Sequence, residues 1–358
     1  MHTKRYRIAL AVLTLALLGT GCGDDEADNE SASSTTAASA PTGPQSYTVI
    51  VDGPSTLNAE NYALGLYFPK TLSVSPGDSV TFDNRGVSDP HTVSFGLKAD
   101  RSDSPPLIID GGSGNPAVFG PCFTAEPPRA DMVSCPPPVS GTPEFTGRGY
   151  WNSGALLPTS LPPEAGPKAV TLKVAPSTAP GAYTVTCLLH RYMESTLQVV
   201  ASDAERQAPA QVSATAEKEL ADAKARAAAQ VAPPTPATAD GAAVAASWGD
   251  DAVGVNRFSP ETVSIKVGQT VTWTDHSSWL PHTVSFNPPF KSEAEPGALA
   301  PVGAKSGSEF AGGVAHSGIF GPSPPLPTNK FSLTFTKPGR YPYLCLLHPG
   351  MAGTVEVS

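Results

Sequence analysis

Basic residues are scarce in this chain of 358 residues, and beyond the first seven residues they form no cluster. There are 23 Lys and Arg against 32 Asp and Glu, which gives a formal net charge of −9. Removing the three positive charges of the first seven residues leaves −12 for the chain from residue 22 onward. An acidic chain without a basic patch is not expected to bind nucleic acid.

Long apolar runs are also nearly absent. The clearest run, residues 8–18, is too short to span a bilayer as a helix. It follows three basic residues, which is the order of a secretory signal, so we expect residues 1–22 to be a leader. Small residues before Cys22 resemble a bacterial lipoprotein cleavage site, although Gly19 stands where Leu is usual. We expect lipidated Cys22 to anchor an exported protein to the outer face of the cell membrane. The alternative is an ordinary signal with an incidental Cys.

The segment after the leader has almost nothing to bury. Residues 23–44 begin with acidic side chains and continue with Ser, Thr and Ala. Such a composition predicts a disordered tether that lets the folded part stand off a membrane surface.

Histidine, cysteine and methionine number only seven, five and four, yet one of each lies within seven residues near the C-terminus. Cys345, His348 and Met351 have the spacing Cys-x2-His-x2-Met, and His282 lies upstream, just inside an apolar, strand-like run. One thiolate, two imidazoles and a weak axial thioether are the ligands of a blue-copper electron-transfer site. A closed structural zinc site would use Cys, His or carboxylate in place of Met.

The same constellation occurs earlier in the chain. His91 is followed by Cys187, His190 and Met193, in the same order and with the same short spacings. Two such sets indicate a duplicated copper domain. The first loop also carries Arg191 and Glu194, which are bulky and charged. The alternative is therefore a first half kept as a structural partner without copper.

These motifs resemble the cupredoxins, the type 1 copper proteins, and the spacing in the loop is amicyanin-like. The resemblance covers roughly residues 45–200 and 247–358. It implies a Greek-key β-sandwich in each half, with a mononuclear copper near one end. By this resemblance one ligand set is His91, Cys187, His190 and Met193, and the other is His282, Cys345, His348 and Met351.

The strand pattern predicts an all-β fold of two tandem β-sandwich domains, residues 45–202 and 247–358. Residues 71–82 contain two alternating runs around a Pro-Gly turn, which predicts a β-hairpin, and residues 262–273 repeat this pattern. Short strands with turn signals are typical of a sandwich or barrel, and long helical patterns are absent from both halves.

An insertion rich in Pro, Gly and Asp interrupts the first half between residues 95 and 169. It contains Cys122 and Cys135, thirteen positions apart. In an exported protein these two residues are expected to form a disulfide, and the alternative is two free thiols. No cysteine is then left over, because Cys22 is assigned to lipid and Cys187 and Cys345 to copper.

Residues 203–246 join the two halves. Residues 209–231 are rich in Ala and predict a helix, with Lys218, Asp222 and Arg226 at i, i+4 spacing. Large apolar residues are few there, which favours a spacer helix over a helix packed between the two domains. Residues 233–246 read as a flexible Pro/Ala linker.

Cupredoxin repeats also build multicopper oxidases and copper nitrite reductases, which by that resemblance need further His ligands. Only His2, His276 and His316 remain, and His2 lies in the leader. His276 is expected in a polar loop, and His316 aligns with Asn152 of the first half. No His is adjacent to either candidate copper cysteine. We therefore do not expect an enzyme.

Two other functions remain. One is an electron carrier with unidentified redox proteins as donor and acceptor, and the other is a protein for copper storage, delivery or tolerance. A delivery protein would usually expose Met- or His-rich tracts, which this chain lacks, so the carrier is preferred. His348 is then expected to reach the surface and exchange electrons with a partner. Its expected surroundings are an uncharged patch of Leu280, Pro281, Leu346, Pro349 and Met351.

Overall fold

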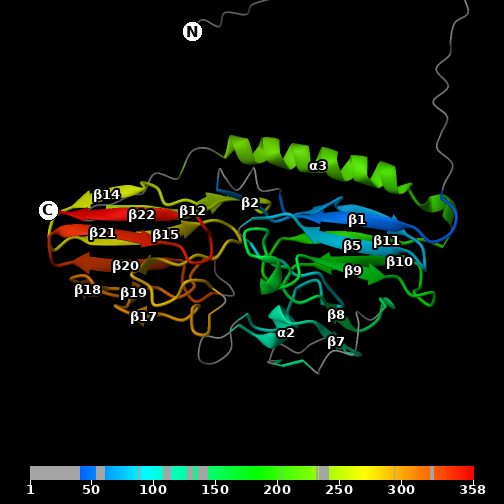
Figure 1. Ribbon diagram of the computed structural model, residues 1–358, viewed down its shortest axis with the longest axis horizontal. Helices are drawn as coiled ribbons and strands as arrows, with labels where there is room; N and C mark the ends of the chain where they lie inside the picture. The colour runs from blue at the N-terminus through cyan, green and yellow to red at the C-terminus, as the bar shows by residue number, and fades with distance from the viewer. Residues whose placement is uncertain are drawn as a thin grey trace, which may run out of the picture. The chain divides into compact units, whose positions relative to one another are not determined.

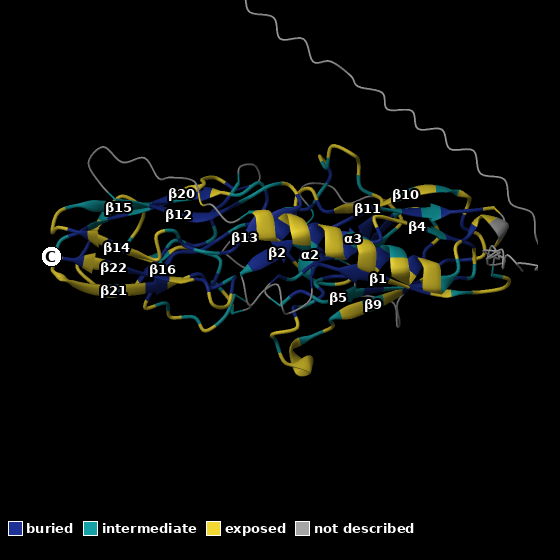
Figure 2. Cartoon of the chain, turned by 90° about the horizontal axis from the view of Figure 1, so that it is seen from above, coloured by how far each residue is buried: buried dark blue, intermediate teal, exposed yellow. Residues whose placement is uncertain are grey.

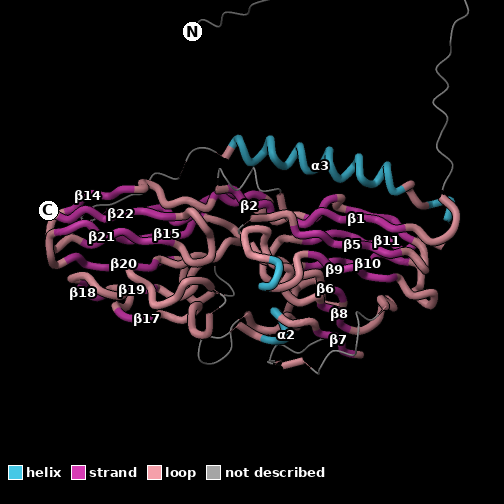
Figure 3. Tube along the Cα trace, viewed as in Figure 1, coloured by secondary structure: helices cyan, strands magenta, loops and turns pink. Residues whose placement is uncertain are grey.

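The structure is a computed structural model that describes residues 41–53, 61–87, 89–107, 114–126, 132, 134–135, 144–201, 203–230, 233, 242–293, 295–322 and 326–358. These residues belong to one compact unit. The predicted leader, Cys22 and the predicted tether up to residue 40 lie outside them. Within the described ranges, no helix is long and apolar enough to cross a membrane. Strands dominate, as the all-β prediction requires (Figure 3).

The first half forms two sheets around a shared core (Figure 1). One sheet has the order β3 (Tyr67–Phe68), β1 (Ser46–Val51), β5 (Ser79–Asn84) and β9 (Ala169–Lys173). The other has the order β4 (Thr71–Val74), β11 (Glu194–Val199), β10 (Gly181–Thr186), β6 (Ser94–Phe95), β8 (Tyr150–Asn152) and β7 (Cys122–Thr124). Every second side chain of β5 is buried, and Val80 and Phe82 share the core with Leu72 of β4. This is the predicted β-sandwich.

The second half has the same two-sheet plan. One sheet has the order β18 (Ser308–Phe310), β20 (Lys330–Phe335), β15 (Thr270–His276), β12 (Ala242–Gly249), β13 (Val253–Val255) and β2 (Tyr62–Leu64). The other has the order β14 (Thr262–Ile265), β22 (Ala352–Val357), β21 (Gly339–Leu344), β16 (Ser285–Phe286), β19 (Ala315–His316) and β17 (Val302–Gly303). Trp273 of β15 is fully buried at the centre of this core.

The hairpin predicted over residues 71–82 is wrong, and so is its repeat over 262–273. In the first half β4 and β5 belong to different sheets, and in the second half β14 and β15 do as well. The turn between β4 and β5 carries the chain from one sheet to the other, with the carboxylate of Asp78 accepting the backbone N–H of Ser75 at 2.7 Å. A sheet change and a hairpin share the same alternating pattern, because both place every second side chain in the core.

Strand β2 belongs to the first half of the sequence but pairs with the second half. It runs antiparallel to β13, with Leu64 opposite Val253 and Tyr62 opposite Val255. Figure 1 shows β2 at the junction of the two halves. The predicted boundary near residue 202 therefore does not separate two independent sets of sheets.

Helix α3 (Pro209–Ala229) lies within the predicted helical segment, but it is not a free spacer. Val212 belongs to the first-half core, and four further residues of the helix form a third cluster with residues of β1, β2, β3, β12 and β13. They are Ala216, Leu220, Ala223 and Ala227. Figure 2 shows the buried and exposed stripes of this helix. The spacer preference was wrong because it counted only large side chains, whereas alanines allow a helix to pack closely.

Two further details of the joining segment differ from the prediction or refine it. Lys218 and Asp222 form the expected i, i+4 ion pair at 2.6 Å, but Arg226 instead contacts Asp250 of the second half at 2.8 Å. Strand β12 already begins at Ala242, so residues 242–246 are strand and not part of a flexible linker.

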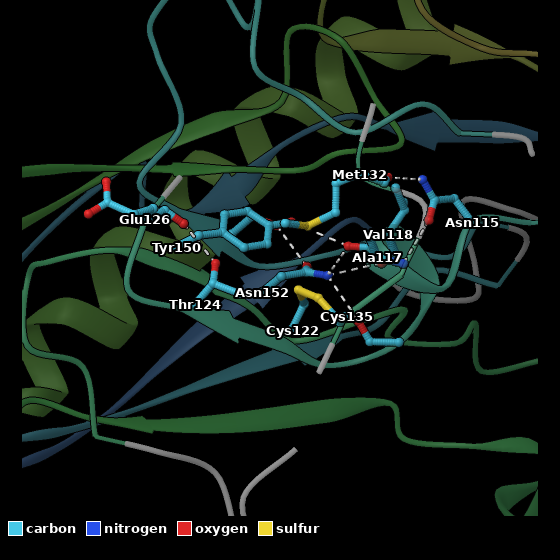
Figure 4. The surroundings of a disulfide bond; sticks show 12 residues. Asn115, Ala117, Val118, Cys122, Thr124, Glu126, Met132, Cys135, Tyr150 and Asn152 are labelled. Atoms are coloured by element: carbon cyan, nitrogen blue, oxygen red, sulfur yellow. Dashed lines mark hydrogen bonds between the residues drawn. A yellow bond between two sulfur atoms is a disulfide. The ribbon is translucent and has the colours of Figure 1, made fainter. Parts of the chain in front are cut away.

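The insertion of the first half is tied to the sandwich (Figure 4). Cys122, at the start of β7, and Cys135 form a disulfide with their Cα atoms 5.5 Å apart. The side-chain amide of Asn152 donates to carbonyl oxygens of the short helix α2 (Pro116–Phe119) and to that of Gly120, at 3.1–3.2 Å. Two 3₁₀ turns, η1 (Pro163–Ala165) and η2 (Asp203–Glu205), complete the described elements.

Asp275, near the end of β15, carries a buried carboxyl that should make stability depend on pH. Its Oδ1 accepts the N–H of Ser277, while Oδ2 has no partner among the described residues. Burial raises the pKa of Asp275 to about 7, against the opposing hydrogen bonds from Ser277. The unfolded chain ionises near its usual value, so this group lowers stability as pH rises from about 4 through 7.

Asp275→Asn should therefore stabilise the protein by about 2–4 kcal/mol at pH 8 and have little effect at pH 4. The first half has Asn84 at the corresponding strand position, where its amide donates to the carbonyls of Asp89 and Leu156. Urea unfolding at both pH values tests this, with exposed Asp251→Asn as the control. An equal gain at pH 4 and pH 8 would assign the effect to packing instead of charge.

Candidate metal centres

The first histidine of each predicted set is held by an isolated β-bridge. The N–H of His91 donates to the carbonyl of Leu156 at 3.0 Å, and the N–H of His282 donates to that of Phe320 at 2.7 Å. The residue after each histidine is a threonine, Thr92 or Thr283. Its hydroxyl accepts a hydrogen bond, at 2.8 Å, from the backbone N–H of the residue that follows the cysteine. Each histidine is therefore fixed to the loop that carries the other predicted ligands.

That loop is closed by backbone hydrogen bonds in both halves. The N–H of Cys187 donates to the carbonyl of Met193 at 3.0 Å, and that of Met193 donates to His190 at 3.3 Å. In the second half the same bonds run from Cys345 to Met351 at 2.9 Å and from Met351 to His348 at 3.0 Å. The closed loops explain why the same three-residue spacings recur.

The first set brings three ligand atoms together. Sγ of Cys187 lies 3.6 Å from Nδ1 of His190 and 3.9 Å from Nδ1 of His91, and the two nitrogens are 3.0 Å apart. All three residues are buried. Ligand atoms that share one metal at about 2.0–2.3 Å lie about 3–4 Å from one another, so this triangle can hold one ion.

The second set has nearly the same dimensions. Sγ of Cys345 lies 3.5 Å from Nδ1 of His348 and 3.9 Å from Nδ1 of His282, and the two nitrogens are 3.1 Å apart. The charged residues of the first loop therefore do not change the dimensions of its triangle by much relative to those of the second. Arg191 and Tyr192 are exposed, and they lie on the outside of the loop.

The predicted thioethers lie in the same cores as the thiols. Met193 is 1% exposed and shares the first-half core with Cys187, and Met351, also 1% exposed, shares the second-half core with Cys345. The structure thus places both predicted sets of four in buried, mainly apolar surroundings. His276 is exposed. His316 is buried, bonded to Ser285 and to the carbonyl of Ala298 at 2.8 Å, and is not one of the three residues of the second triangle.

Both thiols are set up to ionise. Burial opposes ionisation, but the neighbouring histidines outweigh it and lower the pKa of Cys187 well below its usual value and that of Cys345 as well. The N–H of Thr92 donates to Sγ of Cys187, and that of Thr283 to Sγ of Cys345, each at 3.4 Å. Hydrogen bonds to a ligating sulfur adjust the electron density that it gives to a metal.

The Nε2 atoms of the proposed histidine ligands, which are not part of the triangles, differ in their hydrogen-bond partners. Nε2 of His91 lies 3.2 Å from the carboxylate of Asp52, and Nε2 of His348 lies 2.9 Å from that of Asp89. Burial would lower the pKa of each of these two histidines, but hydrogen bonds and charge from their partners raise both to about 10. Nε2 of His282 is buried without a partner in the described part of the chain, and the pKa of His282 is lowered well below its usual value, mainly by burial.

The predicted surface position of His348 is wrong. His348 is only 2% exposed, and Leu280 and Met351 of the expected patch are buried as well. The first half covers this loop, since Asp89 belongs to the first half of the sequence. Reciprocally, the ring of Trp279 in the second half packs edge-to-face on His190, with ring centres 4.9 Å apart. Both loop histidines border a cavity of about 610 Å³ between the halves.

Comparisons with known proteins agree with this geometry. A family model described as copper-binding proteins of the plastocyanin/azurin family matches residues 250–358. Plastocyanin of Scenedesmus fuscus is 31% identical over 103 residues, which are 28% of this chain and 86% of that protein. The chain belongs to the plastocyanin/azurin family.

One further relative and one solved structure are also similar to this chain. Amicyanin-alpha of Methylorubrum extorquens is 32% identical over 103 residues, covering 28% of this chain and 65% of that protein. Among solved structures, a purple cupredoxin from Nitrosopumilus maritimus is 24% identical, with a TM-score of 0.20, and covers 33% of this chain and 99% of its own. Both His/Cys/His groups of the present chain could hold a metal ion, as a copper-binding family requires.

Sequence reasoning missed Asp52, Asp89 and Trp279. One signal was available for Asp89, because the repeats differ there: Asp89 precedes Pro90 in the first half, where Leu280 precedes Pro281 in the second. No local pattern marks Asp52, which meets His91 only through the fold.

Proposed function

We propose that the chain is an electron-transfer protein with two type 1 copper sites. His91, Cys187, His190 and Met193 would hold one copper, and His282, Cys345, His348 and Met351 would hold the other. The observation that carries the proposal is the pair of buried Cys-His-His triangles, each closed by a loop ending in a buried Met. When bound, copper supplies a one-electron cycle between Cu(I) and Cu(II).

The donor sets fit copper better than the metals that oxygen ligands select. Each triangle offers one thiol that is set up to ionise and two imidazole nitrogens, and none of its corners is a carboxylate. Thiolate and thioether are soft ligands, and a trigonal His₂Cys set with a weak axial Met is the blue-copper arrangement.

The surrounding chain holds these ligands in one geometry. One ligand of each set is fixed by a β-bridge and the other three by a closed loop, and the same threonine joins the two parts. Ligands that do not move between oxidation states make electron transfer fast, because little reorganisation accompanies it.

Burial favours a carrier over an enzyme or a delivery protein. None of the eight proposed ligands is more than 4% exposed. A catalytic metal site keeps a position open for water or substrate, and a protein that passes copper on must present its ligands to the recipient. We therefore propose no catalytic activity, and we place storage, delivery or tolerance second.

Export and anchoring belong to the same proposal. The leader, with lipidated Cys22, would place the protein on the outer face of the cell membrane, with redox proteins as donor and acceptor. The support is the order of basic, apolar and small residues before Cys22.

The test is a reductive titration of the copper-loaded protein. We expect an intense blue colour that disappears reversibly on one-electron reduction at each of two sites, because each site holds a thiolate next to copper. Retention of copper without a reversible colour change would favour storage or delivery. Cys122→Ser/Cys135→Ser is the matched control, because it removes two cysteines that lie outside both sites.

A further inference from the structure

Asp89 is a residue of the first half whose carboxylate contacts a proposed ligand of the second half. Its Oδ1 lies 2.9 Å from Nε2 of His348, across 259 positions of sequence. Asp89 is 3% exposed and His348 2%, so the contact is shielded from water. A buried carboxylate and imidazole at this distance form a charge-assisted hydrogen bond of the stronger kind.

The other nitrogen of the same ring is committed to the site. Nδ1 of His348 lies 3.5 Å from Sγ of Cys345 and 3.1 Å from Nδ1 of His282. A neutral imidazole has one N–H and one lone pair. If Nε2 donates its hydrogen to Asp89, the lone pair of Nδ1 is left for the metal, and the ring cannot rotate without breaking the hydrogen bond.

The first site contains a comparable pair that lies entirely within its own half. Asp52 backs His91 at 3.2 Å, and its Oδ1 also accepts the N–H groups of Gly53 and Leu64, at 2.6 and 2.8 Å. The second half supplies no such carboxylate for either of its own histidines among the described residues.

We propose that Asp89 is a positioning residue of the second copper site, which is therefore complete only when the first half is docked on it. This inference rests on the proposed function. Carboxylates that hold a ligating histidine fix its tautomer and increase its donor strength. A buried negative charge beside a metal also favours the higher oxidation state, so Asp89 should lower the reduction potential of the second site relative to the same site without it.

The contact at His190 supports this docking from the opposite side. Trp279 of the second half packs on the ring of His190, and its indole N–H donates to the carbonyl of Asp250 at 2.9 Å. Each half thus covers the loop histidine of the other, and among the described residues the contact that brings a carboxylate is the one at His348.

The experiment uses the full chain carrying Cys187→Ser, so that the blue colour and the potential report on the second site alone. In this background Asp89→Asn keeps an acceptor oxygen but removes the charge, and Asp89→Leu removes both. We expect Asp89→Asn to raise the potential while the colour persists. We expect Asp89→Leu also to weaken copper retention against a chelator about 10- to 100-fold. Asp89→Glu keeps a carboxylate at this position, so its reduction potential should lie between that of Asp89→Asn and that of the Cys187→Ser chain.

Asp83→Asn is the control, since it removes a charge of the same half from a partly exposed pair with Arg85, 3.0 Å away. Circular dichroism melts of every variant separate loss of fold from loss of positioning. An unchanged potential and unchanged copper retention in Asp89→Asn and Asp89→Leu would overturn the inference. If the Cys187→Ser chain itself shows no reversible copper couple, the proposed function fails instead.

Discussion

Replacing Cys345 by Ser should abolish the blue colour of the second site and reduce the copper content of the protein from two ions to one. In the proposed site the thiolate would be the ligand responsible for the intense absorption, and a serine hydroxyl is a harder donor that does not ionise near neutral pH. Sγ of Cys345 is also the corner of the triangle shared by His282 and His348, at 3.9 and 3.5 Å. Visible spectra and metal analysis after copper loading measure both effects.

The matched variant is Cys187→Ser, because the first triangle has nearly the same dimensions. Each single variant should keep one site, and the double variant should keep none. The contrary result is that the parent protein and Cys187→Ser both bind one copper ion per chain. In that case the first half would be a structural partner without copper, and only the second set would function.

Replacing Asp78 by Ala should destabilise the protein by about 3–5 kcal/mol, because it removes the buried carboxylate that pairs with the guanidinium of Arg206 and leaves only that of half-exposed Asp203, 3.0 Å away. Nη1 of Arg206 lies 2.6 Å from Oδ1 of Asp78, with side-chain exposures of 1% and 0%. Asp78 also accepts the N–H groups of Gln45 and Ser75, each at 2.7 Å, and so connects the start of β1 to the turn before β5. Urea unfolding measures the loss.

Two comparisons separate the causes of that loss. In Asp78→Ala/Arg206→Met no buried charge remains, since Asp203, the other partner of Arg206, is half exposed. The double variant should therefore be less destabilised than Asp78→Ala alone. The exposed pair of Lys218 and Asp222 is the control, and Asp222→Ala should cost at most about 1 kcal/mol. If Asp78→Ala is destabilised no more than Asp78→Ala/Arg206→Met, the lost backbone hydrogen bonds, and not the charge left on Arg206, account for the effect.

The ligand sets could be read from the sequence because they are largely local. Cys345, His348 and Met351 lie in one short loop, and a closed loop with fixed hydrogen bonds requires a fixed spacing. The remaining proposed ligand, His282, was predicted from its place just inside an apolar, strand-like run, and the repeat of its segment around His91 supported it. Repetition within one chain thus supplied the comparison that a single site would not offer.

What could not be read from the sequence depends on contacts between distant segments. The alternation of residues 71–82 shows which side chains are buried, but it does not show which sheet each strand joins. Asp89 and His348 are 259 positions apart, so their hydrogen bond has no local sequence pattern. The surface position expected for His348 was wrong for this reason, because a second half considered alone leaves that loop uncovered.

The short strand β2 also protects the sheet that it joins. It covers the backbone N–H and C=O groups of β13, which would otherwise form the open edge of a sheet already carrying β12, β15 and β20. Open edges are templates for pairing with other chains and a common cause of aggregation. The residues of β2 precede those of β13 in the sequence and leave the ribosome first, so the covering segment is available when that edge forms. A second half produced without the first would leave β13 as an open edge, and we expect it to aggregate more readily than the full chain.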